Sequence, residues 1–212
     1  TPGGLMDSMK TIIKSMLASE TPVATYVSPQ GARSASAGLY IMYAAHISAM
    51  APNTNTGAAT PIEIGGAPKE PTPGEESSPD EDPAETAPPA EGVAPPLGNE
   101  DAMRAKVIND SVAYIRALAE EHGRNADWAE SAVREAASVT SRDALDLGVI
   151  DLVADNLDDL LKQIDGRAVQ TVAGEKILQT AGISVERVEP SFIERILGFI
   201  ADPNVAVILM SL

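Results

Sequence analysis

The sequence predicts an α/β fold, and two observations support this. Short apolar stretches typical of buried strands occur at 22–27, 47–52 and 149–154, and they alternate with segments of helical periodicity. Such alternation is typical of parallel strands joined by crossover helices. Apolar residues make up 44% of the 212 residues and aromatic residues only 3%, so we expect an aliphatic, alanine-rich core.

The composition excludes several classes of protein. The net charge of −16 argues against a nucleic-acid binder, which needs a basic surface. The chain has no cysteine and two histidines, so we expect no disulfide frame, no cysteine nucleophile and no metal site. No cofactor-binding motif of the P-loop or dinucleotide type is present, and we expect no cofactor.

The charge is concentrated in one window, residues 66–100. It holds nine of the sixteen prolines, nine acidic residues and a single lysine. We expect a disordered insertion, because this composition cannot bury enough apolar surface to offset the entropy of ordering. A negatively charged lid or docking tether is the functional alternative. The flanking segments, 1–65 and 101–189, are then two parts of one domain, followed by a distinct region at 190–212.

The first segment predicts a helix over 5–18, where apolar residues recur at helical spacing. Pro22 ends this helix, and the apolar run 22–27 predicts a strand. A polar turn, an alanine-rich helix, a strand and a loop of small residues follow in that order, at 28–38, 39–46, 47–52 and 53–60.

The second segment predicts a long amphipathic helix over about 100–122 that ends near Gly123. A helix over 127–138 follows, with Asp127 as its N-cap. A short helix, a strand and a further helix come next, at 140–148, 149–154 and 156–166. The region 190–200 predicts an amphipathic helix. The apolar run 205–212 is either the start of a membrane-spanning helix or a core strand, since eight residues cannot span a bilayer.

Two serines, Ser34 and Ser36, are the candidate nucleophiles. They lie among small residues, between the end of a strand and an alanine-rich helix. A nucleophile needs an exposed hydroxyl, small neighbours and backbone N–H groups that can stabilise an oxyanion. The structural alternative is an ordinary serine N-cap, and the pattern is not the G-x-S-x-G elbow.

The candidate bases are His46, His122 and a lysine. We expect His46 to be structural, because it precedes an apolar strand, and His122 to complement a helix C-terminus. Lys106 is flanked by apolar residues, and removal from water favours the neutral amine that can act as a base. The alternative for Lys106 is a surface lysine. Gly3-Gly4 at a helix start could supply N–H donors or form a plain turn.

Several stretches taken together resemble the NfeD-type membrane-bound serine proteases of the ClpP class. The resemblance covers most of both segments, and it depends on the order and spacing of the stretches. These are TPGG (1–4), ASAGLYI (35–41), HISAMAPNTNTGAATPI (46–62), KVINDSVAYIRALAEEHGRN (106–125), SVTSRDALDLGVIDLVADNLDDLL (138–161) and PSFIERILGFIADPNVAVILMSL (190–212).

The resemblance implies a ClpP/crotonase-like fold of stacked strand–strand–helix units and a Ser–Lys dyad. It implies that Ser36, in A-S-A-G, is the nucleophile, with Ser34 as the runner-up. Lys106, which opens K-V-I-N, would be the base. Backbone N–H groups of Gly3 or Gly4 and of Ala37 would form the oxyanion hole.

The resemblance also implies a partner and a location. We expect a hydrophobic peptide or a stomatin-like membrane protein as substrate, at least a homodimer, and a membrane anchor that begins in 190–212. The family has strands before the TPGG segment, so we expect the chain to be a protease-domain fragment. The absence of cysteine fits an extracytoplasmic face. The alternatives are a non-proteolytic scaffold that binds a stomatin-like partner, and a crotonase-like acyl-CoA enzyme.

Overall fold

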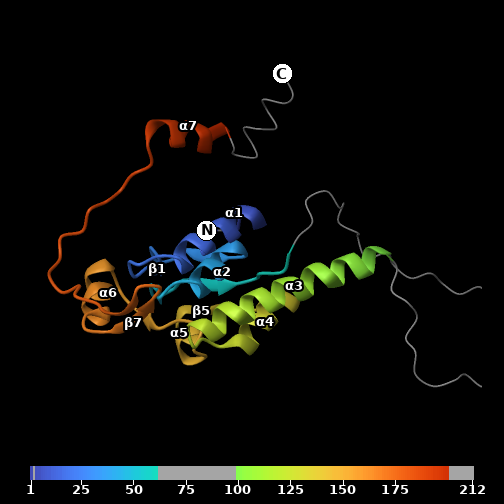
Figure 1. Ribbon diagram of the computed structural model, residues 1–212, viewed down its shortest axis with the longest axis horizontal. Helices are drawn as coiled ribbons and strands as arrows, with labels where there is room; N and C mark the ends of the chain where they lie inside the picture. The colour runs from blue at the N-terminus through green and yellow to red at the C-terminus, as the bar shows by residue number, and fades with distance from the viewer. Residues whose placement is uncertain (2, 62–98, 201–212) are drawn as a thin grey trace, which may run out of the picture.

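The fold contains two small sheets, each with parallel strands. The computed structural model describes residues 1, 3–61 and 99–200 (Figure 1). The first sheet has the strand order β1-β3-β6, and both of its pairings are parallel. In its register Ala24 faces Ile47, and Met50 faces Val153. The three strands are Ala24–Val27, Ile47–Met50 and Leu152–Val153.

The second sheet has the order β2-β4-β5, in which β2 and β4 are parallel and β5 is antiparallel. Its strands are Arg33–Ala35, Asn55–Gly57 and Ser138–Thr140. Along the chain, β1, β2 and α2 are therefore followed by β3, β4 and α3, with one strand of each unit in each sheet. This confirms the predicted fold of stacked strand–strand–helix units.

The described residues form seven helices, and a hairpin, β7–β8, follows α6. The helices are Met6–Leu17 (α1), Ala37–Tyr43 (α2), Asn99–Glu121 (α3), Ala126–Arg134 (α4), Ser141–Asp146 (α5), Leu157–Ile164 (α6) and Phe192–Ile200 (α7). The hairpin strands are Ala168–Thr171 and Gly174–Ile177.

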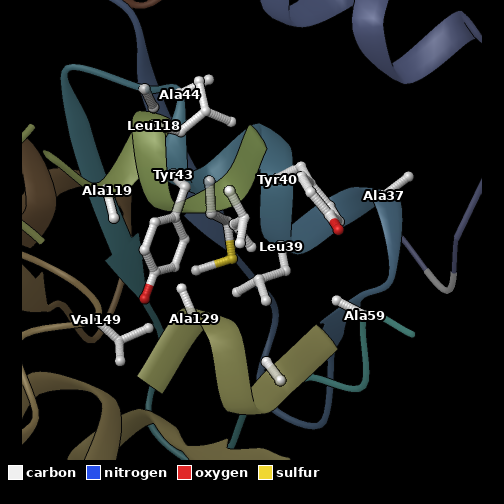
Figure 2. Packing of buried hydrophobic residues seen from close by; sticks show 14 of the residues in the cluster. Ala37, Leu39, Tyr40, Tyr43, Ala44, Ala59, Leu118, Ala119, Ala129 and Val149 are labelled. Carbon is white, nitrogen blue, oxygen red and sulfur yellow. The ribbon is translucent and has the colours of Figure 1, made fainter. Parts of the chain in front are cut away.

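The short helix α2 is the centre of the core. Six of its seven residues are buried, and Leu39 and Tyr43 are completely enclosed. Figure 2 shows α2 packed between α3, which contributes Leu118 and Ala119, and α4, which contributes Ala129. Seven of the nineteen buried cluster residues outside α2 are alanines, in line with the predicted alanine-rich core, and they allow helices to approach closely. This packing holds the N-terminus of α2 in place.

The predicted elements differ from the observed ones mainly in their short strands. Strands β2 and β4 lie in segments predicted as loops, and β5 and the β7–β8 hairpin were not predicted. Three-residue strands carry too few residues to show alternation, so their pairing comes from tertiary contacts. The predicted N-cap of α4 is also wrong, because Asn125, not Asp127, accepts the Trp128 N–H.

Two predictions lie outside the described residues. Nearly all of the acidic insertion, 66–100, and the apolar run 205–212 belong to segments that the structure does not describe. The helix predicted over 190–200 is confirmed as α7. Within 1–61 and 99–200, no helix has both the length and the apolarity needed to cross a bilayer.

A buried arginine fixes the C-terminal end of α2. The Arg124 side chain is 2% exposed and donates to the carbonyls of Tyr43 and Ala45, at 3.0 and 2.9 Å. Arg124 also pairs with Asp151 at 2.7 Å, and Asp151 Oδ2 accepts the Ser48 N–H. One guanidinium thereby joins the end of α2 to the first sheet, and its positive charge complements the helix C-terminus.

Both histidines lie beside this arginine. Their rings meet edge to face, with centroids 5.7 Å apart. His46 Nδ1 accepts the Val23 N–H, whereas His122 Nε2 is buried with no hydrogen-bond partner among the described residues. Burial lowers the pKa of both imidazoles, and the charge of Arg124 lowers these pKa values further. The structural role expected of His46 is confirmed, whereas His122 packs against His46 instead of serving only its own helix end.

Replacing Arg124 should destabilise the fold. Arg124→Met leaves the two α2 carbonyls and Asp151 without their donor, and we expect a loss of about 3 kcal/mol in the free energy of unfolding. Arg134→Met is the matched control, because Arg134 forms an exposed i,i+4 pair with Glu130 and should cost about 0.5 kcal/mol. Urea titration measures both, and equal losses would contradict a special role for Arg124.

Stability should fall on mild acidification. The unfolded chain binds protons at its histidines near pH 6.5, whereas the folded chain resists this because both pKa values are lowered. The free energy of unfolding should therefore decline as the pH falls from about 7 to about 5. Chemical denaturation at several pH values tests this, and a His46→Gln/His122→Gln double variant should show a flatter profile. An unchanged slope would assign the effect to carboxylates instead.

Candidate active site

Ser36 occupies a strained turn between a strand and a helix. It is the single residue between the end of β2 at Ala35 and the start of α2 at Ala37. Its backbone has φ 54° and ψ −121°, a region that residues with a side chain rarely adopt. Such strain persists only where surrounding contacts impose it, and it is common at functional sites. The turn presents the Ser36 side chain at the N-terminus of a buried helix.

Backbone contacts from the second unit hold this turn. The Ser36 N–H lies 3.2 Å from the carbonyl oxygens of both Gly57 and Ala58, at the end of β4. The Ser36 carbonyl accepts the Leu39 N–H at 3.0 Å, which closes the first turn of α2. The small neighbours Ala35 and Ala37 are buried. Sequence pattern placed the serine at a helix start, but the bonds to β4 exist only in the folded chain.

The N-terminal glycines lie directly against Ser36. A side chain at Gly3 would place its Cβ 3.3 Å from Ser36 Cβ and 3.5 Å from Ser36 Oγ. Gly3 also has φ +145°, which favours glycine. A Cβ at Gly4 would be 3.8 Å from the Cβ of Ala37, an ordinary contact. The structure thus brings together four of the five predicted site residues, Gly3, Gly4, Ser36 and Ala37.

A groove of about 760 Å³ runs past Ser36. Its walls come from the start of α1, from the β2–α2 turn and from the segment after β4. Most of its lining is apolar, including Met6, Met9, Tyr40 and Pro61. Burial raises the pKa of Tyr40 to about 12, so its hydroxyl stays protonated. The groove suits an extended peptide with apolar side chains.

Ser34 has a different environment from Ser36. It is buried in the middle of β2, with 5% of its surface exposed. Its Oγ points toward Gly38, where an added Cβ would come within 2.5 Å of that oxygen. Ser34 lines a separate cavity and is absent from the residues of the Ser36 groove. Its packing favours a structural role and leaves Ser36 as the accessible hydroxyl.

Neither histidine is near Ser36. His46 and His122 are the only histidines of the chain, and both line a cavity beyond the C-terminal end of α2, together with Asp151 and Arg167. The cavity shares no residue with the Ser36 groove. A Ser–His pair is therefore not formed, and any base for Ser36 must be another type of side chain.

Lys106 lies on an exposed part of α3, outside the lining of the groove. The residues before and after it, Ala105 and Val107, are partly buried. Figure 1 shows that the N-terminal part of α3 projects beyond the helices packed around α2. Among the described residues there is no contact between Lys106 and Ser36. The role of Lys106 as the base therefore stays a prediction.

Sequence reasoning missed the residues that build the walls of the groove. Met6 and Met9 follow the helical spacing of the first helix, but a periodic pattern does not separate a core face from a groove face. The segment 58–61 looked like a small-residue loop, and only its bonds to Ser36 and α4 reveal its position. Positive φ at Ala58 has no signal in the sequence.

Comparison with curated proteins identifies a relative. No family model matches the chain. The Membrane-bound protease PH1510 of Pyrococcus horikoshii is 37% identical over 214 residues, which cover 100% of this chain and 42% of that protein. The chain therefore spans less than half the length of this relative.

Solved structures of the 1510-N membrane-bound stomatin-specific protease have the same fold. A lysine-to-alanine variant in complex with a substrate peptide has a TM-score of 0.72 at 33% identity, covering 94% of this chain and 79% of that one. A serine-to-alanine variant has a TM-score of 0.67 at 33% identity, covering 90% and 79%. A third structure, described as specific for a stomatin homolog from Pyrococcus horikoshii, has a TM-score of 0.66 at 32% identity, covering 95% and 79%.

The shared fold places the chain in the class of membrane-bound proteases to which these structures belong. The assignment rests on that fold and on sequence identities of 32 to 37%. The chain belongs to the family of NfeD-type membrane-bound proteases that includes PH1510.

The two glycines should differ in their tolerance of a side chain. In Gly3→Ala the new Cβ would press on Ser36 and the backbone would leave its preferred region, so kcat/KM for a hydrophobic peptide should fall by about 100-fold. Gly4→Ala meets only an ordinary contact and should retain most activity. Circular dichroism should show both variants folded. Equal activities of the two variants would contradict a role for the close approach of Gly3 to Ser36.

Proposed function

We propose that this chain is the catalytic domain of a membrane-anchored serine endopeptidase that cleaves hydrophobic segments of membrane-associated proteins. The observation that carries the proposal is Ser36 in its strained turn, open to an apolar groove and flanked by backbone N–H groups. The relatives are named as stomatin-specific proteases, and one was solved with a substrate peptide, which supports a stomatin-like substrate.

Lys106 is our proposed base, in a Ser–Lys dyad of the ClpP class. Asp110 follows Lys106 by one helical turn and so projects from the same face of α3. Lys10 of α1 contacts Asp110 at 3.5 Å, and the start of α1 forms one wall of the groove. This face of α3 is therefore turned toward the helix that borders Ser36, which supports a movement of Lys106 into hydrogen-bonding range when a substrate binds.

Lys10 is a poorer candidate than Lys106. Its ammonium group lies 3.5 Å from Asp110 and 5.6 Å from the centre of the Tyr114 ring. A carboxylate and an aromatic face both stabilise the charged form of the amine. A base needs the neutral form, so these two neighbours oppose that role for Lys10.

The proposed mechanism is acyl transfer. Neutral Lys106 takes the hydroxyl proton of Ser36, whose oxygen attacks the scissile carbonyl and forms a tetrahedral intermediate. The N–H groups of Ala37 and Gly4 donate to its oxyanion; Gly4 is preferred because the Gly3 N–H already donates to Thr1 Oγ1 at 3.3 Å. The lysine ammonium then protonates the leaving amine, and water resolves the acyl-enzyme.

A membrane anchor beyond the described residues and a protease domain on the extracytoplasmic face complete the proposal. The relative is membrane-bound, and more than half of its length has no counterpart in this chain. A homodimer or larger assembly is also proposed, since the family resemblance suggests it.

Cleavage of a hydrophobic peptide library, read by mass spectrometry, tests the dyad. Ser36→Ala and Lys106→Ala should each lower kcat at least about 1000-fold, since members of a catalytic unit depend on one another. Ser34→Ala, which removes a buried hydroxyl, and Arg104→Ala, which removes a cation from the same exposed part of α3, are matched controls and should change kcat little.

The pattern of results separates the candidate functions. Loss in Ser34→Ala with retention in Ser36→Ala would reverse the assignment of the nucleophile. Cleavage by all variants would exclude the dyad. Peptide binding without cleavage by the folded wild-type chain would favour the scaffold.

A further inference from the structure

The helix α7 presents an apolar face to solvent. Phe192 is 77% exposed, Ile193 69% and Leu197 59%, and Ile196 is exposed as well. Positions i, i+1, i+4 and i+5 fall on one side of a helix, so these four side chains form a single stripe. Monomeric soluble proteins rarely expose a continuous apolar stripe without a function for it.

This stripe is separate from the core of the domain. Residues 181–191 are all exposed and contain no helix or strand. Figure 1 shows α7 at the end of this extended segment, away from the helices around α2. None of the four apolar residues belongs to either hydrophobic cluster of the domain. The stripe is therefore available to a partner.

The charges beside α7 are already compensated. Glu194 Oε2 accepts the Ser191 N–H at the helix start, and Arg195 pairs with Glu189 at 2.6 Å. No lysine occurs between 177 and 212, and Arg187 and Arg195 are balanced by acidic neighbours. A strongly charged partner surface would therefore gain little from electrostatic attraction to α7. Burial of the apolar side chains must provide the free energy of binding.

The neighbouring sequence identifies the partner. Residues 205–212 are apolar apart from Ser211, so the chain leads from α7 into a second apolar stretch. The relative is a membrane-bound protein, and the greater part of its length lies outside the aligned region. A nine-residue helix is only about 13 Å long and cannot cross a bilayer.

We propose that α7 lies flat on the membrane surface, with Phe192, Ile193, Ile196 and Leu197 among the lipid chains and Arg195 toward water. This is the arrangement expected of an amphipathic helix with low net charge next to a membrane anchor. The thirteen residues 179–191 reach at most about 45 Å when fully extended. The linker therefore keeps Leu178, where the folded domain ends, within about 45 Å of the bilayer, where segments of membrane-associated proteins emerge.

The absence of cysteine permits a direct test with single labels. The full chain is prepared as Ile193→Cys, on the apolar face, and as the matched Arg195→Cys, on the polar face. Each is labelled with an environment-sensitive NBD fluorophore. Emission and iodide quenching are measured alone, with phosphatidylcholine vesicles, and with vesicles that also contain phosphatidylserine.

With either kind of vesicle, the label at 193 should shift to the blue and its quenching by iodide should fall several-fold. The label at 195 should stay accessible. Equal binding to both lipids is expected because the charges of α7 are compensated. The apolar run 205–212 is present in both variants, so its own affinity for lipid does not produce a difference between them.

Three results would overturn the proposal. Shielding of both positions by vesicles would mean insertion across the bilayer. Shielding of position 193 without vesicles would mean that α7 packs on protein, either a second copy or its own domain. An unchanged signal at 193 while the chain floats with vesicles would mean that 205–212 binds lipid and α7 does not. None of these results depends on peptidase activity.

Discussion

The buried guanidinium of Arg124 is the contact on which the position of α2 depends. It donates to the carbonyls of Tyr43 and Ala45 at one end of this helix and pairs with Asp151, which in turn accepts a backbone N–H of β3. The other end of α2 carries Ser36. Because α2 has only seven residues and is enclosed by α3 and α4, a displacement at its C-terminus would be transmitted to Ser36.

Contacts from the second strand–strand–helix unit hold the strained backbone of Ser36 in place. The carbonyls of Gly57, which ends β4, and of Ala58, which follows it, accept the Ser36 N–H, and Ala58 also has positive φ. In the first unit the chain passes from β2 through Ser36 directly into α2. In the second unit the corresponding passage from β4 to α3 contains the acidic insertion. The described chain therefore stops at Pro61, in the lining of the Ser36 groove, and resumes at Asn99, on the helix that carries Lys106.

Elements with a helical pattern or an apolar run were predictable, whereas the strands of the second sheet were not. Helices α1, α3, α6 and α7 and strands β1 and β3 lie where periodicity and apolar runs predicted them. The three strands of the second sheet have three residues each, which is too short for an alternating pattern, and their pairing requires partners distant in the chain. The N-cap of α4 was predicted wrongly for a different reason. Asn and Asp are both favourable N-cap residues, so the sequence does not rank Asn125 above Asp127, two residues later.

By itself the sequence determined the fold class, the aliphatic core, the place of the insertion and the serine turn. Each of these follows from composition or from patterns of neighbouring residues. Tertiary structure alone decided that Ser34 is buried while Ser36 faces a groove. It also decided that both histidines lie together beyond the opposite end of α2 from Ser36. The accessibility of a side chain and its distance from other groups depend on segments far apart in the chain. Ser36, for example, is surrounded by residues from the N-terminus of the chain, from α2 and from the end of β4.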